Sequence, residues 1–122
     1  MKTLNDSNSV VMVININATY NNTIINVTDF KGNVTFISSA GMVGFKGARR
    51  SSSFAAGAVA QKICTYLKQI KFDEIIVKIK GLGNGRESAM RTLIKYKLPI
   101  KTILDVTPRP HNGCRPCKQR RI

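Results

Sequence analysis

Acidic residues, aromatic residues and cysteines are all scarce in this 122-residue sequence. It has six Asp and Glu, no Trp, one His and three Cys. The odd number of cysteines argues against a framework of disulfide bonds. No run reaches the roughly 18 consecutive apolar residues of a membrane span, and the start of the chain has neither a secretory h-region nor an Arg-rich import pattern. We therefore expect neither a membrane protein nor a secreted disulfide scaffold.

The few acids stand against twenty Lys and Arg, so the formal net charge is +14. Residues 1–45 sum to zero, and residues 46–122 carry the whole excess. A solvated surface needs a net charge of only about 2–8 in a small domain, so the excess indicates a polyanionic partner. No stretch pairs a basic face with the Trp/Phe/Leu face of an interfacial helix, which favours nucleic acid over anionic lipid.

The patterning predicts one α/β domain. A length of 122 residues with 43% hydrophobic residues is enough for a single core. Alternating apolar residues predict an antiparallel meander of three strands, and later helices alternating with strands imply parallel crossovers. The predicted order is βββαβαβ in a mixed sheet: strands 10–18, 23–28 and 34–40, helix 54–70, strand 75–79, helix 86–97 and strand 100–106. We divide the chain into a short N-terminal arm (1–9), an α/β RNA-binding domain (10–106) and an extended basic, Pro- and Arg-rich tail (107–122).

Helical spacing predicts which side chains face the core. In the first helix the apolar residues recur at i, i+4, i+7, i+8 and i+11, beginning at Val59, and Cys64 reads as a small core residue. In the second helix Met90, Leu93 and Ile94 are expected to point inward.

A glycine-rich segment, 41–53, is the first candidate site. Glycines let the backbone approach a phosphate closely, and amides at a helix start point at anions. Lys46, Arg49 and Arg50 add positive charge, and Ser51 and Ser52 add hydroxyl donors. Phe45 is a candidate for stacking on a base. The alternative is an ordinary loop with a serine helix cap and a packing phenylalanine.

A second glycine segment, 81–86, follows a strand and opens a helix. The dinucleotide pattern G-x-G-x-x-G and the P-loop pattern both fail at Arg86. What remains is a glycine loop with Arg86 and Arg91 nearby, which suits backbone phosphate; a plain turn is the alternative.

The tail is the third candidate. Pro108, Pro110 and Pro116 prevent a regular helix, so this cationic peptide is expected to order along an RNA backbone; a merely solvated tail is the alternative. His111, Cys114 and Cys117 form H-x-x-C-x-x-C, but structural zinc usually needs four protein ligands. We assign no metal and no cofactor, and a site shared between Cys114, Cys117 and a neighbouring protein stays open.

Catalysis is not expected. A nuclease with two metal ions needs clustered carboxylates, whereas the predicted first strand has no acid and the six acids are scattered. The sequence also has no G-x-S-x-G nucleophile elbow. A free-standing single-strand RNA binder remains as an alternative class.

Several short motifs occur in a fixed order along nearly the whole chain. They are Asn21-Asn22-Thr23, Gly44-Phe45-Lys46-Gly47 with Arg49-Arg50, Phe54-Ala55-Ala56, Lys80-Gly81, Gly85-Arg86-Glu87-Ser88, Asp105-Val106-Thr107-Pro108 and Pro110-His111-Asn112-Gly113-Cys114-Arg115-Pro116. Together they closely resemble the small-subunit ribosomal protein eleven family in its bacterial and organellar form.

The resemblance implies a fold, a function and partners. The fold would be a ribonuclease-H-like α/β sandwich. The protein would be a structural constituent of the small ribosomal subunit, binding its rRNA on the platform near the messenger RNA exit site. Its neighbours would be ribosomal proteins six, eighteen and twenty-one, where present. The RNA contacts implied by the motifs are Asn21, Asn22, Lys46, Arg49, Arg50, Arg86, Arg109, His111, Asn112, Arg115, Lys118, Arg120 and Arg121.

The sequence departs from the family pattern in places. The family usually has proline where Leu82 and Asn84 stand, and Pro-Lys where Cys117 and Gln119 flank Lys118. The longer basic N-terminal extension of bacterial members is missing. Ile, Asn and Lys supply 36 of the 122 residues, which suggests an AT-rich genome. These features favour a mitochondrial ribosome, with a bacterial cytoplasm or a plastid as the alternative.

Overall fold

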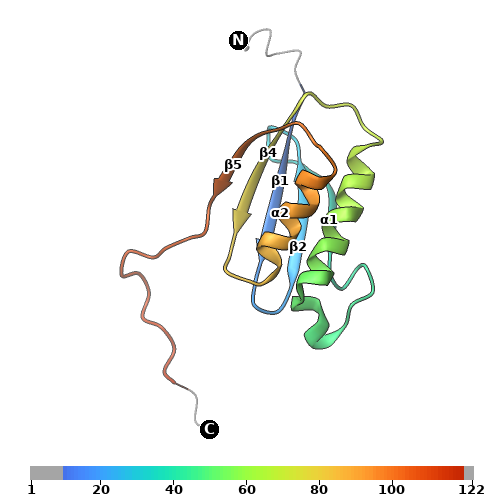
Figure 1. Ribbon diagram of the computed structural model, residues 1–122. Helices are drawn as coiled ribbons and strands as arrows, with labels where there is room; N and C mark the ends of the chain where they lie inside the picture. Colours follow the sequence, from blue (N-terminus) through green and yellow to red (C-terminus); the bar gives the residue numbers. More distant parts are fainter. Residues whose placement is uncertain (1–9, 120–122) are drawn as a thin grey trace.

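The computed structural model describes residues 10–119. The predicted N-terminal arm, and Arg120 and Arg121 of the tail, lie outside the described residues. The described residues form five strands, two α-helices and one short 3-10 helix, joined by loops (Figure 1). In chain order they are β1 (Val11–Ala18), β2 (Thr23–Thr28), β3 (Val34–Ser39), η2 (Gly47–Ser51), α1 (Ser53–Leu67), β4 (Glu74–Lys80), α2 (Gly85–Lys95) and β5 (Ile100–Asp105).

The strands form one mixed sheet in the order β3-β2-β1-β4-β5. Strand β2 runs antiparallel to both of its neighbours, whereas β1, β4 and β5 are parallel to one another. The predicted antiparallel meander and the predicted mixed α/β class are therefore confirmed. Because β1, β3, β4 and β5 share one direction, their last residues lie at the same end of the sheet. We call this the carboxyl end, and the opposite one the amino end.

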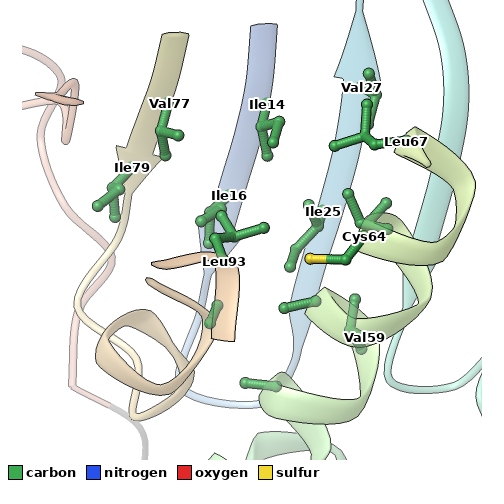
Figure 2. Packing of buried hydrophobic residues seen from close by; sticks show 14 of the residues in the cluster. Ile14, Ile16, Ile25, Val27, Val59, Cys64, Leu67, Val77, Ile79 and Leu93 are labelled. Carbon is green, nitrogen blue, oxygen red and sulfur yellow. The ribbon is translucent and has the colours of Figure 1, made fainter. Parts of the chain in front are cut away.

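Both helices cover one face of the sheet and pack against each other (Figure 1). The alternation in β1 explains why: Met12, Ile14, Ile16 and Ala18 are buried beneath the helices. From α1 the predicted stripe supplies Val59, Ile63 and Leu67, and Cys64 is fully buried beside them, as expected. Figure 2 shows Val59, Cys64 and Leu67 on the side of α1 that faces the sheet. On the other face of β1, Asn15 donates from Nδ2 to Oδ1 of Asn26 on β2 at 2.8 Å. That face of the sheet is the more polar one, since Asn15 and Asn26 both lie on it.

The prediction for the inner face of α2 is partly wrong. Leu93 is buried and Met90 is half-buried, but Ile94 is 58% exposed. The buried positions of α2 are Gly85, Ala89 and Leu93, each one turn after the last, so the contact with the core is a narrow stripe. The helix also ends at Lys95, two residues before the predicted end, and Lys97 adopts a left-handed φ of 56°. Neither helix of the described chain has the length and hydropathy needed to cross a bilayer.

The three cysteines should differ sharply in reactivity. Burial raises the pKa of the Cys64 thiol to about 11, whereas Cys114 and Cys117 are exposed. Because the thiolate is the nucleophile, iodoacetamide at pH 8 should modify Cys114 and Cys117 and leave Cys64 intact until denaturant unfolds the chain. Peptide mass spectrometry of the alkylated native protein checks this. Modification of native Cys64 at the rate of the tail cysteines would contradict the packing of α1.

Candidate RNA-binding surface

The carboxyl end of the sheet gathers the segments that the sequence marked out separately. The β1–β2 turn, the loop from β3 to α1, the glycine loop from β4 to α2 and the start of the tail all leave the sheet there (Figure 1). Hydrogen bonds tie these loops together. The Gly83 amide donates to the Ala18 carbonyl at 2.8 Å, and the Ser53 hydroxyl donates to the Asn84 carbonyl at 3.4 Å. The topology therefore builds one continuous surface from motifs distant in sequence.

The β1–β2 turn presents one of its two predicted asparagines to solvent. The Thr19 amide donates to the Asn22 carbonyl at 2.9 Å, which closes the turn between β1 and β2. Asn22 is half-buried, and its Oδ1 accepts a hydrogen bond from the Thr23 amide at 2.8 Å. Asn21 stands at the exposed tip beside Tyr20. Asn22 therefore shapes the turn, and Asn21 is the freer of the two for a polar ligand.

The loop between β3 and α1 carries a compact group of cations. Gly44 and Gly47 have positive φ values of 102° and 59°, which favour glycine, and η2 follows directly. Lys46 and Arg49 are exposed. Arg50 is half-buried, and its Nε donates to the Gly47 carbonyl at 3.3 Å. The predicted loop is thus a structured turn that holds its charges near the start of α1.

The two serines predicted to face RNA have structural partners. The Ser52 hydroxyl accepts from the Ala55 amide at 3.1 Å and donates to the Arg49 carbonyl at 2.9 Å, so it is the N-cap of α1. The predicted serine cap is confirmed. The Ser51 hydroxyl donates to the Ala48 carbonyl at 2.9 Å. Both hydroxyls already use their proton within the protein, and they can offer RNA only a lone pair.

Three glycines in the segment 81–85 are needed for close packing. A Cβ atom on Gly81 would lie 2.2 Å from the Ala18 carbonyl oxygen, and Gly81 has a φ of +100°. On Gly83 it would lie 2.1 Å from the Thr19 carbonyl oxygen. On Gly85 it would lie 2.1 Å from the Thr23 hydroxyl. These glycines let the loop lie directly on the end of β1, a role that the failed nucleotide-binding patterns did not indicate.

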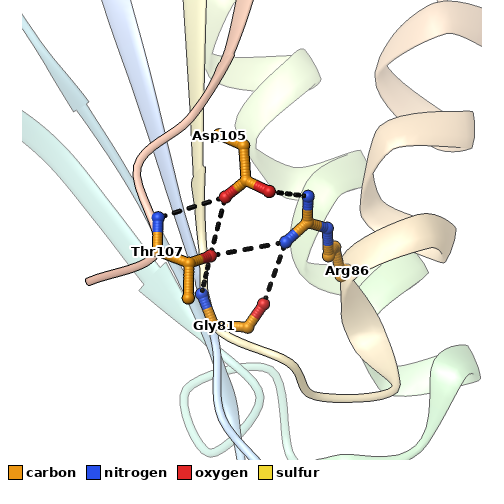
Figure 3. Close-up of polar contacts among 4 residues, drawn as sticks. All are labelled: Gly81, Arg86, Asp105 and Thr107. Atoms are coloured by element: carbon orange, nitrogen blue, oxygen red, sulfur yellow. Dashed lines mark hydrogen bonds and ion pairs between the residues drawn. The ribbon is translucent and has the colours of Figure 1, made fainter. Parts of the chain in front are cut away.

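Arg86, whose side chain is 31% exposed, is held in place by the residues that begin the tail (Figure 3). Its Nη2 pairs with Oδ2 of Asp105 at 2.7 Å, and its Nη1 donates to the Gly81 carbonyl at 3.1 Å. The Thr107 hydroxyl donates to Oδ1 of Asp105 at 2.7 Å and accepts from the Gly81 amide at 3.1 Å. We call Gly81, Arg86, Asp105 and Thr107 the tail clamp. Arg86 and Asp105 each belong to a motif noted in the sequence. The ion pair between them could not be predicted, because the two residues are 19 positions apart.

Because of the tail clamp, the stability of the fold should change with pH in the acidic range. Hydrogen bonds from Arg86, and then from Thr107, hold the pKa of Asp105 well below its usual range. A lowered folded-state pKa stabilises the fold above the unfolded value of about 3.9, and this stabilisation is lost as the pH falls further. Asp105→Asn should therefore melt below the wild type at pH 7, by a modest margin because the carboxylate is 57% exposed.

The difference in melting temperature between Asp105→Asn and the wild type should be smaller at pH 3 than at pH 7. Thermal melts at both pH values check this, with Glu87→Gln as the control because Glu87 takes part only in an exposed pair with Arg91. A gap of equal size at both pH values would contradict the clamp.

Arg91 lies two turns into α2. Its Nη2 pairs with Oε1 of Glu87 at 2.8 Å, four residues earlier on the same helix face. Both side chains are highly exposed, so the pair is open to competition from a phosphate.

Beyond Thr107 the described tail has no helix or strand and is exposed, and it leaves the domain from the end of β5 (Figure 1). Its predicted contact residues are therefore accessible: Arg109, His111, Asn112, Arg115 and Lys118. Cys114 and Cys117 are exposed free thiols. Across residues 10–119 no group of three or more His, Cys, Asp or Glu side chains is placed to hold a metal ion.

The chain is similar to proteins of known family over almost its whole length. The model of the family described as ribosomal protein S11 matches residues 12–121. The small ribosomal subunit protein uS11m of Prototheca wickerhamii is 49% identical over 110 residues, covering 90% of this chain and 86% of that protein. The uS11 protein of Chlamydia muridarum is 49% identical over 110 residues, covering 90% of this chain and 83% of that protein. The uS11m protein of Marchantia polymorpha is 51% identical over 105 residues, covering 86% and 84%.

These matches confirm the family predicted from the motifs, and with it the prediction that the chain is not an enzyme. The chain belongs to the ribosomal protein S11 family, whose members are structural components rather than enzymes.

Proposed function

We propose that this chain is a structural constituent of the small ribosomal subunit and binds small-subunit rRNA through the carboxyl end of its sheet and its tail. The observation that supports this best is the convergence of the cationic β3–α1 loop, the β1–β2 turn and the root of the tail at one end of the domain. Lys and Arg side chains grouped in this way neutralise phosphates and release counterions. The relatives named above carry the name of a small-subunit ribosomal protein.

The exposed cations are expected to make the main phosphate contacts. These are Lys46 and Arg49 on the β3–α1 loop and Arg109, Arg115 and Lys118 on the tail, with Arg120 and Arg121 beyond the described residues. Arg86 contributes by anchoring the tail, since Asp105 neutralises its charge. Arg50 and Arg91 can each add a contact by giving up a partner within the protein.

The finer placement follows from the family resemblance. On that basis we expect the chain to lie on the platform, near the path of messenger RNA at the exit site, beside ribosomal proteins six, eighteen and twenty-one where these are present. We also assign the domain a ribonuclease-H-like fold. The strand order β3-β2-β1-β4-β5 with β2 as the antiparallel strand supports that assignment.

A mitochondrial ribosome is the compartment we propose. The sequence is rich in Ile, Asn and Lys, as an AT-rich organellar genome would give, and relatives named uS11m are among the similar proteins. Bacterial uS11 proteins are equally similar, so a bacterial cytoplasm is the alternative, together with a plastid. Fractionation of the source cells and detection of the chain with an antibody distinguishes the compartments.

Sucrose-gradient sedimentation tests the proposed function. A tagged chain should travel with the small ribosomal subunit and remain there after a moderate salt wash. A chain that stays in the light fractions while bound to a transcript would instead be the free-standing single-strand RNA binder, and would refute the ribosomal assignment.

A further inference from the structure

The most exposed large apolar side chain of the described residues lies next to the cations of the β3–α1 loop. Phe54, in the first turn of α1, is 78% exposed. Its neighbours Ala55 and Ala56 are fully buried, so the backbone of this turn is fixed against the core while the ring points away from it. An aromatic ring held in this way is accessible to a ligand.

A second aromatic ring fixes the position of Phe54. The rings of Phe45 and Phe54 meet edge to face, with centroids 5.8 Å apart and an interplanar angle of 76°. Phe45 is half-buried against the core, and its amide donates to the Ala40 carbonyl at 3.1 Å. Phe45 is therefore the packing residue of the pair, whereas the sequence marked it as the stacking candidate. The open ring is Phe54.

Phe45 also lines a hollow that carries two cations. Val43, Gly44, Phe45, Lys46 and Arg49 line an open surface hollow of about 360 Å³. The segment that forms the hollow and α1 carries charge of one sign only, because the sequence has no acidic residue between Asp29 and Asp73. An exposed ring beside a cationic hollow is the combination that binds unpaired nucleotides, in which the base stacks and the phosphate is neutralised.

We propose that Phe54 and this hollow form a site for an unpaired RNA base, which stacks on Phe54 while its phosphate lies against Lys46 and Arg49. This proposal rests on the proposed function and refines it, since phosphate contacts alone would recognise any duplex. A wholly apolar protein partner fits less well, because docking it here would bury the charges of Lys46 and Arg49 without partners. The site gives the chain a means to select a bulge or a loop in the rRNA.

The test measures binding of the purified full chain to small-subunit rRNA transcribed in vitro, with Phe54→Leu as the main variant. Loss of one stacked base should weaken binding about 5- to 100-fold. The slope of affinity against salt should stay unchanged, because leucine removes no charge. Phe54→Trp keeps a stacking surface and should bind within about threefold of the wild type.

Phe30→Leu is the matched control. Phe30 is 76% exposed and lies in the β2–β3 turn, at the amino end of the sheet. The Phe30→Leu variant should bind rRNA with the affinity of the wild type. Ultraviolet cross-linking of the wild-type complex, read by mass spectrometry, gives a second measurement that does not depend on folding of the variants, and Phe54 should be among the cross-linked residues.

Full affinity in folded Phe54→Leu would overturn the proposal. So would unchanged rRNA affinity combined with lost binding of a neighbouring ribosomal protein, which would make this a protein-docking surface. Failure of the wild type itself to bind rRNA would instead count against the proposed function.

Discussion

Replacing Arg109, Arg115 and Lys118 together by Gln should weaken binding to small-subunit rRNA by about 100-fold at 0.15 M salt. Each phosphate contact steepens the dependence of log K on log salt by about 0.7–0.9, so the slope should fall by about 2.1–2.7. The described tail is exposed to solvent, so its side chains can follow the RNA. Folding should be unaffected because none of the three side chains is buried. Titrations at several salt concentrations measure both quantities.

A charge-matched control separates a local effect from a loss of net charge. Lys31, Lys71 and Lys97 are exposed and lie in loops at the amino end of the sheet. Changing these three to Gln removes the same total charge, and we expect a much smaller loss of affinity and of slope. An equal loss in both triple variants would show that the protein attracts RNA through its overall charge, and would contradict a tail that lies on the RNA.

Gly83→Ala should cost about 3 kcal/mol or more of unfolding free energy, a large share of the usual 5–15 kcal/mol. The added Cβ would lie 2.1 Å from the Thr19 carbonyl oxygen and 2.8 Å from the Ala18 carbonyl carbon, so backbone must move. The 2.8 Å hydrogen bond from the Gly83 amide to Ala18 would break with it. We expect the melting temperature to fall by about 10 °C or more.

Gly41→Ala is the control for this prediction. A Cβ at Gly41 would find its nearest neighbours 4.0 Å away, so only the ordinary effect of a methyl group is expected. Thermal melts of both variants provide the comparison. A Gly83→Ala protein that melts with the wild type would contradict the contact between the glycine loop and the end of β1.

Local pattern was enough to predict most of the fold. The alternation around Ile14 and Ile16 and the helical spacing of Val59, Ile63 and Leu67 each reflect burial against a single neighbouring layer. The predictions were wrong where the burial of a side chain depends on how wide the contact between its helix and the core is. Ile94 fits the apolar spacing of α2, but the helix buries only a narrow stripe and leaves this side chain in solvent.

The candidate site was harder to predict because its contacts join residues that are far apart in the sequence. Arg86 and Asp105 are 19 residues apart, and only the parallel pairing of β4 with β5 brings them together. The glycine loop is explained by its approach to Ala18 and Thr19, far earlier in the sequence. The sequence does not show which of Phe45 and Phe54 is exposed, because that depends on how the β3–α1 loop packs against α1. Sequence motifs identified the segments, and the topology shows how they share one surface.

The orientation of the domain on the rRNA can be measured most directly by cross-linking protein to RNA in purified small subunits and identifying the modified peptides. We expect cross-links in the β3–α1 loop with Phe54, in the β1–β2 turn and in the tail, all of which leave the carboxyl end of the sheet. Cross-links confined to peptides of the amino end, around Lys31, Lys71 and Lys97, would contradict it.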